Sequence, residues 1–90
     1  MTPAEILQKT KNYLDNAGIS YIPNSIEYLT LEEDGFTREG LQISMHSVTY
    51  HVSIEDIDTA MHVMIINNTT FDLMYIITPH GYIEINPAFL

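Results

Sequence analysis

The chain contains no cysteine, and this limits how a 90-residue protein can be stabilised. Neither a disulfide framework nor a thiolate nucleophile is available, so stability must come from packing. A chain of this size buries only about 60 to 65% of the surface that its unfolded form exposes, which is enough for one hydrophobic core and not for two. We therefore expect a single domain over residues 1–90. The lack of cysteine also suits a reducing compartment.

The charge is acidic and unevenly spread along the chain. The sequence holds 12 acidic and three basic residues, for a net charge of −9, and no lysine or arginine follows Arg38. Such a charge repels phosphate backbones and anionic lipids and attracts basic surfaces. A protein that binds nucleic acid directly needs the opposite sign, so that function is not expected.

Apolar residues are frequent for a chain with so few charges. They make up 46% of the sequence. Charged residues make up 17%, below the roughly 25% of ordinary domains. We expect part of the apolar surface to be left for a partner. The alternative is that a small domain exposes apolar atoms without any partner.

The first predicted element is a helix over about Pro3–Ala17. Thr2 can cap it, Pro3 suits the first helical position, and Glu5 sits where a capping box closes. Gly18 follows as a left-handed stop. The residues that share one helical face are Ile6, Thr10, Tyr13, Leu14 and Ala17.

Two strands are predicted next, over residues 25–31 and 36–45, because apolar and polar residues alternate in both segments. Asp34-Gly35 between them is a hairpin-turn signal. The parity of the apolar residues changes at His46-Ser47, which predicts a bulge or a short turn there.

A second helix is predicted to begin at Ser53, with Asp56 three residues after the cap and acidic residues near the positive end of the helix dipole. Its buried stripe would be formed by Ile57, Met61, Met64 and Ile65. Residues 71–78 follow as a strand that is apolar on both faces, either central in the sheet or against a partner. A turn over Thr78–Gly81 then leads to a last strand, Tyr82–Asn86.

These elements predict an α+β fold with the order α-β-β(-β)-α-β-β, in which an antiparallel sheet has its helices packed on one face. Small acidic secretion-chaperone-like folds have a similar order. This resemblance is one of topology, with no shared motif, and such proteins end in a further helix that this chain lacks.

The sequence indicates a cytoplasmic protein without a membrane segment. Residues 1–5 lack the basic start and apolar run of a signal peptide. The longest uncharged stretch, residues 59–71, contains several Asn and Thr residues and is shorter than the roughly 20 apolar residues that a membrane span needs.

The four histidines, His46, His51, His62 and His80, are the only strong nitrogen ligands in the chain. His46 and His51 would point to opposite faces of a regular strand, and no His-x-x-x-His spacing is present, so we expect no metal site. Glycine-rich phosphate loops and nucleophile elbows are also missing from the sequence. We expect no cofactor and no catalytic residue.

The acidic residues are the strongest candidates for a binding site. Helix-dipole stabilisation and a solvated hairpin tip are the simpler explanations for them. The sharper hypothesis is that they form two anionic patches for a basic partner. The residues of these patches are Glu32, Glu33, Asp34, Glu39, Glu55, Asp56 and Asp58. An apolar interface is a further candidate, with core packing as its alternative, and its residues are Met74, Ile76, Tyr82 and Phe89.

The leading hypothesis is a protein-binding domain that inhibits a basic, nucleic-acid-handling enzyme, in the manner of an antitoxin. Carboxylates on a rigid sheet would occupy a groove built for phosphates, and bacteriophages and mobile elements often encode such mimics. The first alternative is a self-assembling, homodimeric adaptor or chaperone-like domain that pairs through residues 71–85. The second is a small enzyme that uses His46 or His51 with a nearby carboxylate.

Overall fold

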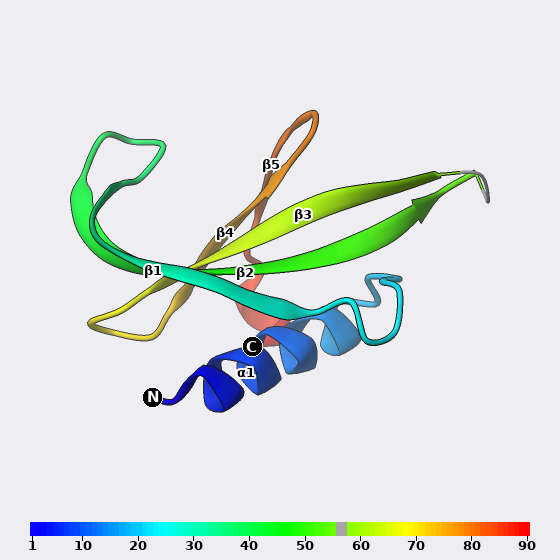
Figure 1. Ribbon diagram of the computed structural model, residues 1–90, viewed down its shortest axis with the longest axis horizontal. Helices are drawn as coiled ribbons and strands as arrows, with labels where there is room; N and C mark the ends of the chain where they lie inside the picture. The colour runs from blue at the N-terminus through cyan, green and yellow to red at the C-terminus, as the bar shows by residue number, and fades with distance from the viewer. Residues whose placement is uncertain (56–57) are drawn as a thin grey trace.

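The computed structural model describes residues 1–55 and 58–90. Its elements are α1 (Pro3–Asn16), β1 (Glu27–Phe36), β2 (Gln42–Ile54), β3 (Asp58–Asn67), β4 (Leu73–Thr78), β5 (Gly81–Glu84) and the short 3-10 helix η1 (Pro87–Phe89). The strands form one antiparallel sheet whose spatial order follows the chain, β1-β2-β3-β4-β5. Figure 1 shows α1 lying against one face of this twisted sheet. Within the described residues, no helix is long and apolar enough to cross a bilayer.

The first helix is confirmed, together with the local signals that predicted it. Thr2 Oγ1 accepts a hydrogen bond from the Glu5 amide at 3.2 Å, and Glu5 Oε1 accepts one from the Thr2 amide at 3.1 Å, which closes the capping box. The helix ends at Asn16, and Gly18 follows with φ at 69°. The predicted apolar face is buried as expected, at Ile6, Thr10, Tyr13 and Leu14.

The predicted second helix is wrong, because its described residues form the end of β2, at Ser53 and Ile54, and strand β3. β3 pairs with β2 at ten consecutive positions, from Met45 opposite Asn67 to Ile54 opposite Asp58. β3 is apolar on both faces, so its apolar residues fit a helical spacing as well as an alternating one. Met61, Met64 and Ile65 therefore have the spacing of a helical face although they lie in a strand. Asp56 and Ile57, which were assigned to the same helix, lie outside the described residues. The similarity to secretion-chaperone-like folds depended on an order of elements that includes this second helix, so it does not hold.

The predicted hairpin turn at Asp34-Gly35 is also wrong. Both residues lie inside β1, where the register shifts between Glu32 and Gly35 as an extra residue is accommodated. A Cβ atom on Gly35 would come within 3.0 Å of the Met45 side chain, so the glycine permits close packing across the strands. The chain turns later, where the Thr37 amide donates to the Leu41 carbonyl.

The parity change at His46-Ser47 does not interrupt β2, which runs unbroken through both residues. The register between β1 and β2 shifts beside this position. The extra residue lies in β1, because Tyr28 pairs with Val48 and Thr30 with Ser47. The change of parity therefore marks the point at which the apolar side chains of β2 switch from one face of the sheet to the other.

The sheet has a hydrophobic cluster on each face. The main core lies between α1 and the sheet, and its fully packed members include Ile6, Leu14, Val48, Tyr50, Met64, Ile66 and Ile76. The second core lies on the opposite face and is formed by Met45, Ile65 and Tyr75, with Ile43, Val63 and Met74 packed against them. β4 contributes to both, which agrees with its prediction as a strand that is apolar on both sides. The turn before β5 is confirmed at Thr78–Gly81.

Candidate functional site

The structure separates the predicted acidic residues into two groups. Glu32, Glu33 and Asp34 lie in β1 and Glu39 lies in the following loop, and all four are exposed. Glu55 follows the end of β2 and Asp58 begins β3, and Asp56 lies outside the described residues. Figure 1 places the β1–β2 loop and the adjoining ends of β2 and β3, at Ile54 and Asp58, toward opposite ends of the molecule, whose longest dimension is 37 Å.

The three basic side chains of the chain are engaged in internal contacts. Lys9 Nζ donates to the Phe71 carbonyl at 2.5 Å, and Lys11 pairs with Asp15 at 2.8 Å. Arg38 pairs with Glu39 at 3.1 Å and with Glu84. The ion pairs of the described residues thus include none of the carboxylates of β1, which are Glu27, Glu32, Glu33 and Asp34.

Arg38 also fixes the β1–β2 loop on the second core. Its guanidinium lies over the rings of Tyr75 and Tyr82, at 5.2 and 4.9 Å from their centroids. Its backbone amide donates to the Tyr75 hydroxyl at 3.3 Å, and Thr37 beside it is buried. The hydrogen bond from Arg38 lowers the pKa of Glu39. This loop therefore holds the end of the hairpin in a defined position.

Large apolar side chains accompany the carboxylates on the same hairpin. Phe36 is 66% exposed and Leu41 is 65% exposed at the two sides of the loop, and Leu29 and Leu31 are exposed on β1. Because β1 is an edge strand, its outer edge is also open among the described residues. We call this set the hairpin surface: Leu29, Leu31, Glu32, Glu33, Asp34, Phe36, Glu39 and Leu41. Sequence reasoning found its acidic members and missed its apolar ones, because it assigned Leu41 to an ordinary alternating strand.

The predicted apolar interface residues do not form one surface. Ile76 is fully buried in the main core, and Phe89 packs against Tyr13 of α1 with ring centroids 6.4 Å apart. Met74 packs against the second core on the other face. Only Tyr82 is fully on the surface, with 52% of its area exposed.

His46 is buried at the end of the main core and hydrogen-bonded through both ring nitrogens. Its Nε2 lies 2.5 Å from Asn68 Oδ1, and its Nδ1 lies 2.8 Å from the Tyr28 hydroxyl. Since the amide oxygen can only accept, Nε2 carries the proton and Nδ1 accepts from Tyr28. The ring also stacks on Phe71. As expected for one continuous strand, His51 points to the opposite face of β2.

His62 and Tyr50 form a second, partly buried contact. His62 lies in β3, where its Nδ1 is 3.1 Å from the hydroxyl of the fully buried Tyr50. Burial raises the pKa of the Tyr50 hydroxyl and lowers the pKa of the His62 imidazole below its usual value of 6.5. Within the described residues, no group of three or more His, Cys, Asp or Glu side chains could hold a metal ion.

We expect His62 to make the fold less stable in mild acid. Its pKa is lowered in the folded state, so the unfolded state binds the proton more tightly. The contribution of His62 to the free energy of unfolding should therefore be fully present above about pH 6.5, and it should be lost as the pH drops toward the folded pKa. Urea unfolding between about pH 7.5 and about pH 5.5 measures this loss, and the His62→Gln variant should lose less than the wild type. Equal losses in both proteins would contradict the assignment.

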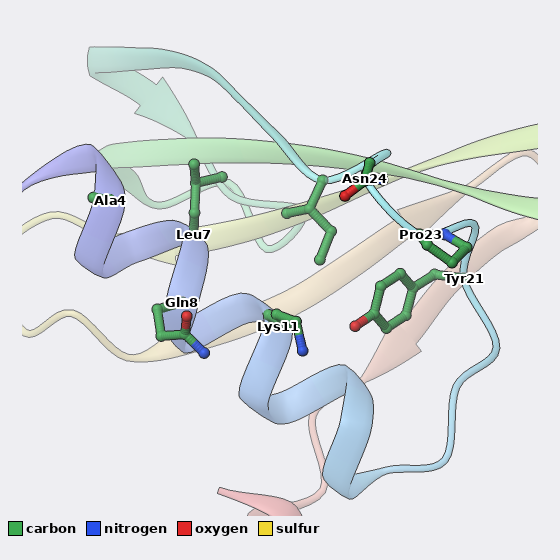
Figure 2. Close-up of a pocket in the computed structure, with 8 residues that line it drawn as sticks. Ala4, Leu7, Gln8, Lys11, Tyr21, Pro23 and Asn24 are labelled. Carbon is green, nitrogen blue, oxygen red and sulfur yellow. The ribbon is translucent and has the colours of Figure 1, made fainter.

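Two grooves flank α1, one on each side. The first, of about 510 Å³, lies between the helix and the connection to β1, and Figure 2 shows Leu7, Lys11 and Tyr21 around it. Lys11 Nζ and the Tyr21 hydroxyl are both bound to Asp15, at 2.8 and 2.7 Å. These bonds lower the pKa of Asp15 and raise that of Lys11. The polar groups at this groove thus stabilise the connection to the helix.

The hairpin surface combines carboxylates with exposed apolar side chains. By contrast, the ring nitrogens of His46 are hydrogen-bonded to Tyr28 and Asn68, and Nδ1 of His62 is hydrogen-bonded to Tyr50. Comparison of the chain with known protein families, with curated proteins and with solved structures found no match.

Proposed function

We propose that this protein is a small binding domain that recognises a basic partner protein through the hairpin surface and acts as its antagonist. The observation that carries the proposal is the combination on one hairpin of carboxylates outside the internal ion pairs with exposed Leu29, Leu31, Phe36 and Leu41.

The charge of the chain supports a basic partner. With a net charge of −9 and its three cations in internal contacts, the protein attracts positive surfaces and accelerates their encounter. Glu32, Glu33 and Asp34 stand in succession on an edge strand, where they also discourage pairing with other strand edges. A groove that normally holds phosphates would accept such a row of carboxylates, so a nucleic-acid-handling enzyme is the partner class we favour.

The apolar side chains supply what charge alone does not. Electrostatic attraction gives fast association and selects the sign of the partner, but most of the binding energy of protein interfaces comes from a few desolvated residues, often aromatic ones, within a ring of contacts that excludes water. Phe36 and Leu41 are both largely exposed at the two sides of the β1–β2 loop, which also carries Glu39. We therefore expect the partner to offer an apolar pocket bordered by Lys or Arg.

The hairpin surface can be tested by removing its charges. A triple variant with Glu32→Gln, Glu33→Gln and Asp34→Asn should lose on the order of 100-fold in affinity for the partner, because three complementary charges are removed from the contact. A matched variant with Glu55→Gln, Asp58→Asn and Asp72→Asn removes the same charge elsewhere and should bind almost as the wild type does. The measurement is a tagged pull-down from lysate, washed in steps of rising salt, followed by titration of the protein that is captured.

The outcomes separate specific recognition from general attraction. A basic nucleic-acid enzyme that the wild type and the matched variant capture, and that the triple variant does not, supports the proposal. Equal capture by all three proteins would refute a role for these carboxylates. An equal loss in both variants would show that only net charge matters and would equally refute the hairpin surface as the site.

A further inference from the structure

On the sheet face opposite α1, the described side chains of β2, β3 and β4 include no carboxylate, lysine or arginine, although the chain is strongly acidic. Residues directly opposite one another in an antiparallel pair share a face, so the register assigns each side chain. Because Tyr50, Met64 and Ile76 face α1 in the main core, their neighbours in sequence face the other way. The side chains of β2, β3 and β4 on that face are Ile43, Met45, Ser47, Thr49, His51, Ser53, Thr59, Met61, Val63, Ile65, Asn67, Tyr75 and Ile77.

A continuous apolar strip remains exposed on this face. Val63 pairs with Ile77, Ile77 pairs with Tyr82, and Met61 lies two residues from Val63 on the same strand. Met61 and Tyr82 are half exposed and Ile77 is 37% exposed, while Val63 is partly buried between them. We call these four residues the open-face strip. Hydroxyl-bearing Thr49, Ser53 and Thr59 adjoin it on β2 and β3.

The distribution of charge selects the partner for this strip. In the described residues, the charged groups on this face lie on β1, at Glu27 and Glu32, and beside Tyr82. There the Arg38 guanidinium lies 4.9 Å from the Tyr82 ring centroid and pairs with Glu39 and Glu84. A basic partner gains little attraction from this strip, because the carboxylates beside Tyr82 are already paired with Arg38. Two copies of a chain with a charge of −9 repel one another wherever their acidic surfaces meet, and they repel least through this face.

We infer that a second copy of this chain covers the open-face strip, in a two-fold symmetric dimer with the two sheets packed face to face. A standard interface buries about 800 Å² of each partner, which is about one seventh of the 5569 Å² accessible surface of this protein. The hairpin surface lies outside the strip, so the dimer does not depend on the proposed partner binding and would present two hairpin surfaces at once.

The dimer has a salt dependence opposite to that of partner binding. Its contact is apolar while the two protomers repel, so salt should strengthen association by screening the repulsion. Sedimentation equilibrium of the full chain, from micromolar to millimolar concentration and at about 0.05 M and about 0.5 M salt, measures this effect. We expect a dimer whose Kd falls with salt. A monomer under all these conditions would overturn the inference, and it would leave the salt-sensitive pull-down result unaffected.

Matched substitutions locate the contact. Met61→Glu with Ile77→Glu puts four like charges across the two-fold axis and should raise the Kd of the dimer at least ~100-fold. Leu29→Glu with Leu41→Glu adds the same charge on the hairpin surface and should change the Kd far less. Equal disruption by both pairs would overturn the inference, because association would then not depend on the strip.

A measurement on the wild type keeps the test independent of how the variants fold. The ε-methyl resonance of Met61 should shift on dilution as the dimer dissociates, whereas that of the buried Met64 should stay in place. A dimer that dissociates without any shift of the Met61 methyl would overturn the assignment to this face.

Discussion

Replacing Leu14 by alanine is expected to lower the free energy of unfolding by about 3 kcal/mol, within the 2 to 5 kcal/mol seen for buried leucines. Leu14 is fully buried where α1 meets the sheet, among Ile6, Tyr13 and Tyr50. The substitution removes apolar contacts and leaves a cavity that the helix cannot close without losing its other contacts. Small domains have only about 5 to 15 kcal/mol of stability, so the loss is large.

Urea unfolding followed by circular dichroism measures this loss through the midpoint of the transition, with the slope expected to stay unchanged. Leu29→Ala is the matched control, because Leu29 is 60% exposed and its truncation should cost within about 0.5 kcal/mol. If the two variants were equally destabilised, the placement of α1 over the main core would be contradicted.

Replacing His46 by phenylalanine is expected to cost about 2 to 3 kcal/mol, although the ring and its stacking on Phe71 are retained. The variant leaves the Tyr28 hydroxyl and the Asn68 amide oxygen without the partners they have at 2.8 and 2.5 Å. Both groups are partly buried. A polar group left unsatisfied away from water costs about 1 to 3 kcal/mol, more than a hydrogen bond contributes when it is present.

A double-mutant cycle with Tyr28→Phe tests this explanation. Removing both partners together eliminates the unsatisfied hydroxyl, so the double variant should be more stable than the sum of the single changes predicts, by about 1 kcal/mol. Urea unfolding of the four proteins provides the cycle. Strict additivity would show that His46 and Tyr28 contribute independently, contrary to the geometry.

The parts of the fold that local interactions determine could be predicted from the sequence. The capping box of Thr2 and Glu5 and the stop at Gly18 are made within a few residues, so α1 was placed to within one residue at its end. The turn at Thr78–Gly81 was found for the same reason. In both cases the residues that carry the signal are also the residues that make the hydrogen bonds.

β3 could not be predicted, because its conformation is decided by a partner strand. Val63, Ile65 and Ile66 are β-branched and suit a strand, but Met61 and Met64 also fit a helical stripe. Pairing along the whole of β3 with β2 resolves this ambiguity, and it is not visible in either segment alone. The Asp34-Gly35 signal failed in a similar way, since glycine serves a bulge over Met45 as well as it serves a turn.

The candidate site likewise has one part that the sequence alone predicts and another that depends on how the strands pair. That Glu32, Glu33 and Asp34 are exposed follows from their charge, and the sequence located them. Their separation from Glu55 and Asp58, and their association with Phe36 and Leu41, depend on where the strands turn. The open-face strip likewise becomes visible only when the register places Met61, Val63 and Ile77 side by side.

Contacts within the sheet join strands that follow one another in the chain, whereas contacts between the two ends of the chain join residues far apart in the sequence. Every strand pairs with its neighbour in the chain, so the sheet can assemble from successive hairpins with short loops to close. The two ends of the chain are joined by contacts 73 residues apart, from the Asn86 amide to the Tyr13 hydroxyl and from the Asn16 side chain to the Phe89 carbonyl. Low contact order in the sheet favours rapid folding, and closure of these terminal contacts is the step that bears the greatest loss of chain entropy.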